Sequence, residues 1–588
     1  MMLLLTAPSE KHPFDSYLDE ILLTEGYNLR EKMWAEPGLS AEELSRYGLV
    51  IISSGAAAII EGEVVREYIA EGGKAIVFKP PREWVGIFGL TPREEMYATV
   101  SGGYLRVNDS HPWLAGLAAR DLQCPTEAHV YEPQSAESLA VIAGQLGMGT
   151  QYPAVALGRI GRGMGVVFAY DLAECIVRFH QGDQGYASDG PNPDANRDGK
   201  FTADDLFEPI RDERLKHVPQ ADVHQDLLVR VIVGLSGDSG PLPRLWHFPG
   251  GAPGIVLLDG DGDGMNWDDL LWTVDTCERY GAKFTFFLMD AEIEAFSPEG
   301  VEAMRKRGHA FGPHPWVSFQ PSVGDWRHEV GRIVTDMRGK FGLEPQALRS
   351  HSCIFPGWDE SPAIFSSNGL RLDTNFMNGY RYQSGFANSS ALPVKFISRD
   401  GAIIDCYEQS TVHGDDSLGS PKCMLPVHNQ QECIDLSLRY MTDLAHRYHG
   451  VYHPYFHPIY LGGRGRIPTA EWFVRVLEAA RELELPSLNA EQWLAFNDAR
   501  RSVSIQDYNW RPETRQCSFR ICAELAVEGL TLMLPQASEG TACSAAVNGV
   551  SAAVAHKAYE RLYWATLEVD LAAGEEATVS LLWAPAPR

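Results

Sequence analysis

Three aspartates follow a short apolar run near the middle of the chain. Residues 255–258 are all apolar, and Asp259, Asp261 and Asp263 come next, separated by single glycines. An apolar run of this length between glycines indicates a strand buried on both faces, and α/β proteins place their chemistry in the loops after such strands. Alternate side chains of an extended chain point to one side, where three carboxylates repel unless a cation or a shared proton relieves them. The spacing therefore predicts a cation or proton-transfer site, with a solvated acidic turn as the alternative.

Histidines follow later segments of the same part of the chain. His314 ends a Gly-His-x-x-Gly-x-His motif, His351 lies two positions after Arg349, and His457 follows two aromatic residues. The order of these motifs between residues 243 and 502 resembles the polysaccharide deacetylases of carbohydrate esterase family 4, the NodB-homology domain. The resemblance implies a distorted (β/α) barrel with its site at the carboxyl ends of the strands.

The resemblance also implies a reaction. Members of this family remove N-acetyl groups from amino sugars of a glycan, with a metal-activated water, an aspartate base and a histidine acid for the departing amine. One carboxylate and two imidazoles that leave positions open are typical of catalytic zinc. A divalent metal, zinc in the first place, is the expected cofactor, and a glycan or oligosaccharide is the expected substrate.

The aspartates divide two roles between them. Family members carry two adjacent aspartates, of which the first is the base and the second binds the metal. An alignment of residues 256–258 without gaps makes Asp261 the base and leaves Gly262 at the metal position, so that Asp263 becomes the metal ligand. In the alternative assignment Asp259 is the base and Asp261 the ligand.

The metal histidines depart from the family pattern at one position. His314 matches a metal ligand of the family, but the second ligand histidine, four positions later, is Ser318 in this chain. His351, in the loop of Arg349, is the expected replacement, because barrel loops converge at one face. A histidine with a purely structural role is the alternative for both His314 and His351.

Three further residues match family positions around the reacting groups. His457 matches the histidine acid, and His453 is its competitor. Arg349 matches the position that orients the base, and Asp373 the position that orients the acid histidine. His309, the first histidine of the Gly-His motif, is expected to be structural.

The elements that must position these residues alternate along the chain. A strand at 283–289 and helices at 267–280 and 299–306 are predicted for the middle part. In the N-terminal part, residues 1–242, apolar runs predict strands at 49–52 and 74–78, with helical periodicity between them.

The N-terminal part is predicted to be a doubly wound α/β domain. It resembles class I glutamine-amidotransferase-like domains by its pattern of elements. The nucleophile elbow of active members, a cysteine between glycines, is missing, and Cys124 is expected in a loop. A scaffold or binding role without catalysis is therefore predicted for this domain.

An insertion within the N-terminal part has the spacing of a calcium loop. Oxygen donors stand at loop positions 1, 3, 5, 7 and 12, with glycine at position 6 for the sharp turn, as in dockerin-type repeats. These positions are held by Asp194, Asn196, Asp198, Lys200 through its carbonyl, Asp205 and Gly199. A structural calcium ion is predicted, with an ordinary Asx- and Gly-rich surface loop as the alternative.

Composition and the C-terminal part complete the expectations. Residues 503–588 alternate short apolar runs with turns, which predicts a small β-sandwich.

The net charge of −28 argues against nucleic acid and anionic membranes as partners, and no run is long and apolar enough to span a membrane. Ten scattered cysteines show no disulfide framework. The opening residues lack the basic region of a signal peptide, which favours a cytoplasmic location unless a leader was removed.

Two other functions compete with a deacetylase. Gly262 and Ser318 keep open a catalytically silent homologue that binds glycans or serves as a scaffold. Hydrolysis of another amide or of an ester on the same fold is the other alternative. Metal analysis separates the silent homologue from both enzymes.

Overall fold

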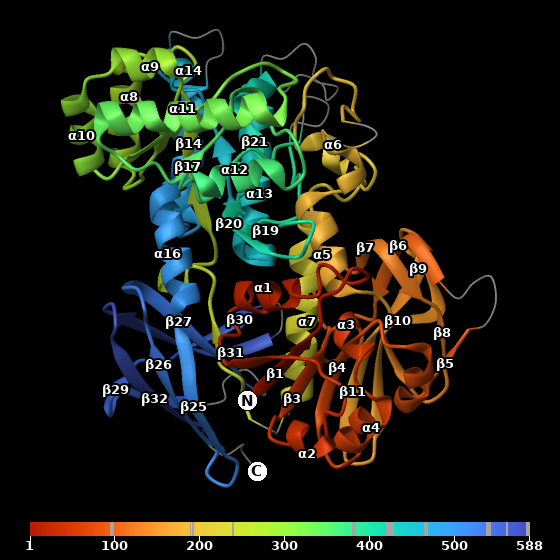
Figure 1. The fold of residues 1–588 in the computed structure, drawn as a ribbon. Coiled ribbons are helices and arrows are strands. Elements are labelled where there is room, and N and C mark those ends of the chain that lie inside the picture. Colours follow the sequence, from red (N-terminus) through yellow and green to blue (C-terminus); the bar gives the residue numbers. More distant parts are fainter. Residues whose placement is uncertain are drawn as a thin grey trace.

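The computed structural model describes most of the chain. The described residues are 1–93, 99–188, 190, 193–237, 240–378, 384–418, 429–463, 469–536, 543–559 and 562–583. The chain is a mixed α/β protein with several sheets, and its N-terminal, middle and C-terminal parts lie around a common junction (Figure 1). Among the described helices, none is long and apolar enough to cross a membrane.

The N-terminal part is built on a nine-stranded sheet, of which one half is parallel. The parallel half pairs its strands in the order β2 (Arg30–Trp34), β1 (Met2–Thr6), β3 (Leu49–Ile52), β4 (Lys74–Phe78) and β11 (Gly163–Phe168). The helices of this half include α1 (Tyr17–Thr24) and α4 (Gly62–Ala70). Strands β1, β3 and β4 are almost entirely buried, as apolar runs on a covered parallel sheet require.

The other half of this sheet is antiparallel, which the prediction of a doubly wound domain did not include. Its strands are β10 (Met148–Ile160), β9 (Glu137–Gln145), β6 (Thr99–Val107) and β7 (Asp121–His129), joined to β11 through β10. Cys124 lies buried in β7 and not in a loop, because alternate residues of β7 face the core.

The middle part carries the predicted chemistry on three sheets of short strands. The five-stranded sheet pairs β16 (Ala310–Pro313), β15 (Thr285–Leu288), β14 (Asp259–Asp261), β23 (Pro454–Tyr455) and β21 (His413–Gly414), all parallel. A three-stranded sheet holds β22 (Val451–Tyr452), β13 (Ile255–Leu257) and β24 (Ser487–Leu488). The third pairs β17 (Ala347–Leu348), β18 (Leu372–Asp373), β20 (Ile403–Glu408) and β19 (Val394–Ile397). A closed barrel stays a prediction, because the described strands are hydrogen-bonded as three sheets.

Helices cover these sheets. They are α8 (Trp267–Arg279), α10 (Pro298–Lys306), α11 (Val323–Phe341), α12 (Glu360–Ser367), α13 (Gln430–Asp443), α15 (Ala470–Glu482) and α16 (Ala490–Ser502). The predicted strand after residue 254 is divided: β13 belongs to one sheet and β14 to the next. Asp259 and Asp261 therefore lie within a strand, and only Asp263 lies in the loop beyond it.

The C-terminal part has two antiparallel sheets. One pairs β25 (Ser504–Arg511), β26 (Gln516–Cys522), β32 (Glu576–Trp583), β28 (Cys543–Val547) and β29 (Val550–Ala552), and the other holds β12 (Arg244–Leu245), β27 (Val527–Gln536), β31 (Leu562–Leu571) and β30 (Ala555–Tyr559). Apolar residues of both sheets, such as Phe519 and Leu532, join one core cluster. Strand β12 comes from the start of the predicted middle part (243–502) but pairs with β27 of the C-terminal part.

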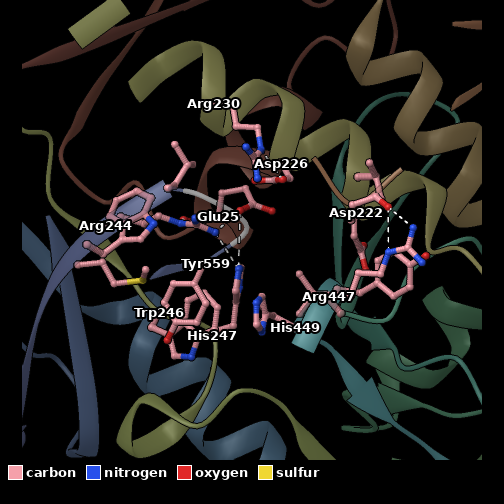
Figure 2. Close-up of a pocket in the computed structure, with 17 residues that line it drawn as sticks. Glu25, Asp222, Asp226, Arg230, Arg244, Trp246, His247, Arg447, His449 and Tyr559 are labelled. Carbon is pink, nitrogen blue, oxygen red and sulfur yellow. Dashed lines mark hydrogen bonds and ion pairs between the residues drawn. The ribbon is translucent and has the colours of Figure 1, made fainter. Parts of the chain in front are cut away.

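A cavity of about 60 Å³ lies where the three parts meet (Figure 2). Its charged side chains have partners within the protein: Glu25 forms an ion pair with Arg244, which lies 2.9 Å from His247 Nε2, and Arg230 pairs with Asp226. Trp246 and Tyr559 stack with 4.4 Å between ring centres. We interpret this cavity as part of the packing between the three parts, because its charged groups already have partners within the protein.

Asp222, at the edge of this junction, should make stability depend on pH. Asp222 in α7 (Gln220–Ser236) accepts hydrogen bonds from Ser390 Oγ at 2.6 Å and from the Ala391 N–H at 2.7 Å, and burial raises its pKa to about 7. The folded state keeps a proton on the Asp222 carboxyl that the unfolded chain releases near pH 4. The stabilisation from this protonated carboxyl is therefore fully present below pH 4 and is lost as pH rises through 7. The unfolding free energy should fall by about 4 kcal/mol more than in Asp222→Asn across this range. Denaturant unfolding at several pH values checks this, and parallel pH curves for the two proteins would contradict it.

Candidate active site

Asp263, His314 and His351 meet at the carboxyl ends of neighbouring strands. Each offers a ligand atom, and these atoms lie within 4.8 Å of one another. Asp263 Oδ1 is 3.4 Å from His314 Nε2 and 3.2 Å from His351 Nδ1. The two imidazole rings stand nearly perpendicular, with centres 5.5 Å apart. The structure thus brings together the three side chains that the sequence proposed as metal ligands, although they come from loops after β14, β16 and β17.

The hydrogen bonds of His314 leave one ring nitrogen available for an ion. His314 Nδ1 lies 2.8 Å from the carbonyl oxygen of Arg349, so Nδ1 carries the proton and donates it. The other nitrogen, Nε2, is buried and has no hydrogen-bond partner among the described residues. A backbone carbonyl on one nitrogen and a bare nitrogen facing a carboxylate is the arrangement of metal-binding histidines.

Electrostatics at this cluster fit a cation. Burial alone would raise the pKa of Asp263, but the neighbouring imidazoles of His314, His351 and His457 outweigh it and hold this pKa well below its usual range. Burial lowers the pKa of His314, and the charges of Asp261 and Asp263 outweigh it, so the pKa is raised. A site that favours protonated histidine beside carboxylates also favours a metal ion in place of the proton.

Steric crowding explains why position 262, where the family carries its metal-binding aspartate, is a glycine. A Cβ atom on Gly262 would lie 2.7 Å from the carbonyl oxygen of Phe287 and 3.1 Å from Glu292 Oε2. The Gly262 N–H also donates a hydrogen bond of 2.7 Å to the Phe287 carbonyl, which fixes the close approach of the two strands. No side chain fits at position 262, and the next residue, Asp263, carries the carboxylate.

Asp261 and Asp259 differ in what they face. Asp261 lines the cleft and lies 3.8 Å from His314 Nε2 and 3.6 Å from Arg349 Nη1. Asp259 was a second candidate for catalysis, but it is wholly buried, 3.1 Å from Arg349 and 2.8 Å from His453 Nε2. Asp259 and His453 therefore contact Arg349 in the interior of the protein, whereas Asp261 lines the cleft.

His457 is held by a carboxylate that the sequence did not single out. His457 Nδ1 and its backbone N–H each lie 2.7 Å from an oxygen of Asp415, while Nε2 lies 3.3 Å from Asp263 Oδ2. Burial lowers the pKa of His457, but the charges of Asp415 and Asp416 outweigh it and raise the pKa well above its usual value. Asp415 thus orients the His457 ring, which lines the cleft.

The expectation that Asp373 orients the acid histidine is corrected by this geometry. Asp373 is buried and accepts hydrogen bonds from Asn375, and burial raises its pKa to about 7. It lies in β18, whereas Asp415 follows β21, the strand that pairs with β23 just before His457. The adjacent acids Asp415 and Asp416 after a short strand were the available signal.

The cleft around these groups has a volume of about 240 Å³. Besides Asp261, Asp263, His351 and His457, its walls include Tyr455 and Tyr460. Arg349 lies over the Tyr455 ring at 4.5 Å, which fixes the wall next to Asp261. His309 lies outside, with its Nδ1 accepting the N–H of Phe284 at 3.2 Å, as the structural role predicted.

The predicted calcium loop folds as a compact turn. Gly199 has φ +83°, Asp198 accepts the Lys200 N–H at 2.9 Å, and Asp205 accepts the N–H groups of Asn196 and Thr202 at 3.1 and 3.0 Å. Burial raises the pKa of Asp205 to about 7. Two groups of three clustered acidic, histidine or cysteine ligands are found among the described residues, and the loop supplies neither. Calcium binding, with Asp194 at loop position 1, stays a prediction.

Comparisons with known proteins give partial likenesses. No protein-family model matches the chain, and no curated protein matches it. Among solved structures, a protein described as a polysaccharide deacetylase from Mycobacterium smegmatis is 14% identical and aligns over 42% of this chain and 91% of its own, with a TM-score of 0.33. A family 4 carbohydrate esterase from Streptomyces lividans in complex with acetate is 13% identical over 40% of this chain and 91% of its own, with a TM-score of 0.26.

A third solved structure is of the same kind. It is described as a polysaccharide deacetylase involved in O-antigen biosynthesis from Bordetella bronchiseptica, is 17% identical over 39% of this chain and 78% of its own, and has a TM-score of 0.24. At these TM-scores the likenesses carry no argument about function, which has to come from the side chains of the cleft. The resemblance of the N-terminal part to amidotransferase-like domains stays a prediction.

Proposed function

We propose that this chain is a metal-dependent hydrolase that removes N-acetyl groups from amino sugars of a glycan. The observation that supports the proposal is that three kinds of side-chain group lie together at one cleft. Asp263, His314 and His351 offer ligand atoms within 4.8 Å of one another, Asp261 is a carboxylate beside them, and the His457 imidazole lines the same cleft. Amide hydrolysis needs an ion, a base and an acid in such an arrangement.

Asp263, His314 and His351 would hold the ion. One carboxylate and two imidazoles suit zinc and leave coordination positions open, as catalytic sites require. When bound, the ion acts as a Lewis acid that polarises the acyl oxygen and makes water more acidic. The protein contributes the orientation, because the Arg349 carbonyl fixes His314 and His351 Nδ1 lies 3.2 Å from Asp263 Oδ1.

Asp261 and His457 move the protons in this proposal. Asp261, kept close to the Arg349 guanidinium, takes the proton of the attacking water. His457 gives a proton to the sugar nitrogen as the C–N bond breaks, and Asp415 holds its ring in the required orientation. Water, acetyl group and leaving amine would thus meet between residues on opposite sides of the cleft.

A direct test follows the two products. The protein is loaded with zinc and given a chitin oligosaccharide, and acetate and free amine are measured together. Equal amounts of both support de-N-acetylation. Release of an acid from ester or other amide substrates alone would favour a different hydrolase, and stoichiometric metal without any turnover would favour a silent glycan-binding protein.

Calcium at the loop of residues 194–205 is a second, structural part of the proposal. A bound ion would relieve the repulsion among Asp194, Asp198 and Asp205, which the spacing places as ligands. Addition of excess calcium to chelator-treated protein should raise the melting temperature by about 5 °C. Asp198→Ala should abolish this rise, and Arg197→Ala, at a loop position without a ligand role, should keep it. A melting temperature insensitive to calcium would count against the site.

A further inference from the structure

The N-terminal part reaches the active-site cleft through the loop that precedes α6 (Asp204–Phe207). The Phe201 N–H donates to the Phe319 carbonyl and the Phe355 N–H donates to the Phe201 carbonyl, both at 2.8 Å. Thr202 also forms an antiparallel bridge with Ile354. Figure 1 shows α6 beside the middle part, far from the N-terminal sheet. The loop is therefore bonded to the two segments that follow His314 and His351.

Three side chains of this loop line the cleft itself: Asp198, Lys200 and Thr202. The Lys200 ammonium lies 5.0 Å from the centre of the Phe319 ring. Its charge also acts on Asp198 and on the thiol of Cys353, both of which line the cleft. The ammonium thus lies over the segment that follows His314, on a side chain that lines the cleft.

The charges of the cleft make Lys200 distinct. Among the described residues that line it, Lys200 is the one lysine or arginine, whereas Asp261, Asp263 and Asp416 are acidic. An ammonium offers three hydrogen-bond donors on a flexible stem and no acceptor, so its natural ligands are oxygen atoms. Thr202 Oγ1, next to it, is buried without a hydrogen-bond partner among the described residues.

We propose that the N-terminal part completes the substrate cleft and that Lys200 binds an oxygen of the sugar next to the N-acetylated one. This inference rests on the proposed function for the reaction, but it concerns binding. The oxygen belongs to a hydroxyl group in a neutral glycan or to a carboxylate in a uronic-acid glycan. The N-terminal domain, for which the sequence suggested a scaffold or binding role, then takes part in substrate recognition.

The test compares Lys200→Met with the parent on two zinc-loaded assays. One substrate is N,N′-diacetylchitobiose, and the other is a disaccharide of N-acetylglucosamine and glucuronate. In Lys200→Met, KM should rise about 10-fold for a substrate whose hydroxyl group Lys200 binds, and up to about 100-fold if Lys200 binds a carboxylate. The kcat should stay within about 2-fold of the parent value. Lys200→Arg should keep most of the affinity. The arm with the larger effect identifies the oxygen.

Arg197→Met is the matched control, because Arg197 is an exposed cation of the same loop that does not line the cleft. It should leave both substrates unaffected. Calorimetric binding of both disaccharides, metal content and melting curves are measured for each variant. Unchanged KM and affinity in Lys200→Met, a loss of kcat alone, or an equal loss in Arg197→Met would overturn the inference. Failure of the parent to release acetate while Lys200→Met still weakens binding would refute the deacetylase and retain the role of Lys200.

Discussion

His351→Ala should lose both its bound metal and its acetate release. In the proposed site His351 would supply the third ligand, 3.2 Å from Asp263, and without it one imidazole and one carboxylate would remain. A site of two protein ligands binds zinc poorly, so affinity should fall at least about 100-fold, and turnover should fall with it. Metal content after gel filtration and acetate release under the same conditions measure the two effects.

His309→Ala is the matched control for this variant. His309 belongs to the same histidine motif as His314, but its Nδ1 accepts a backbone N–H and it does not line the cleft. It should keep the metal and most of the turnover, although its loss costs some stability. Full metal occupancy in His351→Ala would show that the ion is held elsewhere and would return weight to the silent homologue.

His457→Ala should keep the metal and lose turnover. Its Nδ1 is bonded to Asp415, and its Nε2, 3.3 Å from Asp263 Oδ2, is the nitrogen that would give the proton in the proposed reaction. Loss of a general acid costs about 10²- to 10⁴-fold in kcat. Asp415→Asn should reproduce much of this loss, because the ring then loses its anionic partner.

Asp373→Asn separates the two carboxylates that could have served His457. Asp373 shares its buried site with Glu408 and does not contact the histidine, so kcat should stay within about 3-fold of the parent while Asp415→Asn loses turnover. Steady-state kinetics at saturating zinc make the comparison. A large loss of kcat in Asp373→Asn with none in Asp415→Asn would restore the assignment that the sequence alone suggested.

Local structure was predictable where a single pattern dominates. Strands β3 and β4 have the bounds of their apolar runs, and α8 begins at Trp267 after the Asn266 cap that bonds to Asp269. Such elements are specified by neighbouring residues. The antiparallel half of the N-terminal sheet was missed, because the local sequence of its strands does not fix which segments they pair with or in which direction.

The candidate site was predictable residue by residue only in part. The positions of Asp261, Asp263, His314, His351 and His457 follow from motifs at strand ends, and the structure places all five around one cleft. The partner of His457 could not be read from the sequence, because the choice between Asp373 and Asp415 depends on how β21 and β23 pair. The proposed substrate contact of Lys200 could not be predicted from the sequence either, since the loop before α6 reaches the cleft only through tertiary contacts.

Metal-dependent release of acetate is the measurement closest to the central claim. The full chain is stripped with a chelator, and acetate and amine release from an N-acetylated oligosaccharide is followed as zinc is added back. The account predicts no release without metal and full recovery at one zinc per chain, with no recovery in Asp263→Ala. Release that survives stripping, or one bound zinc without any release, would contradict it.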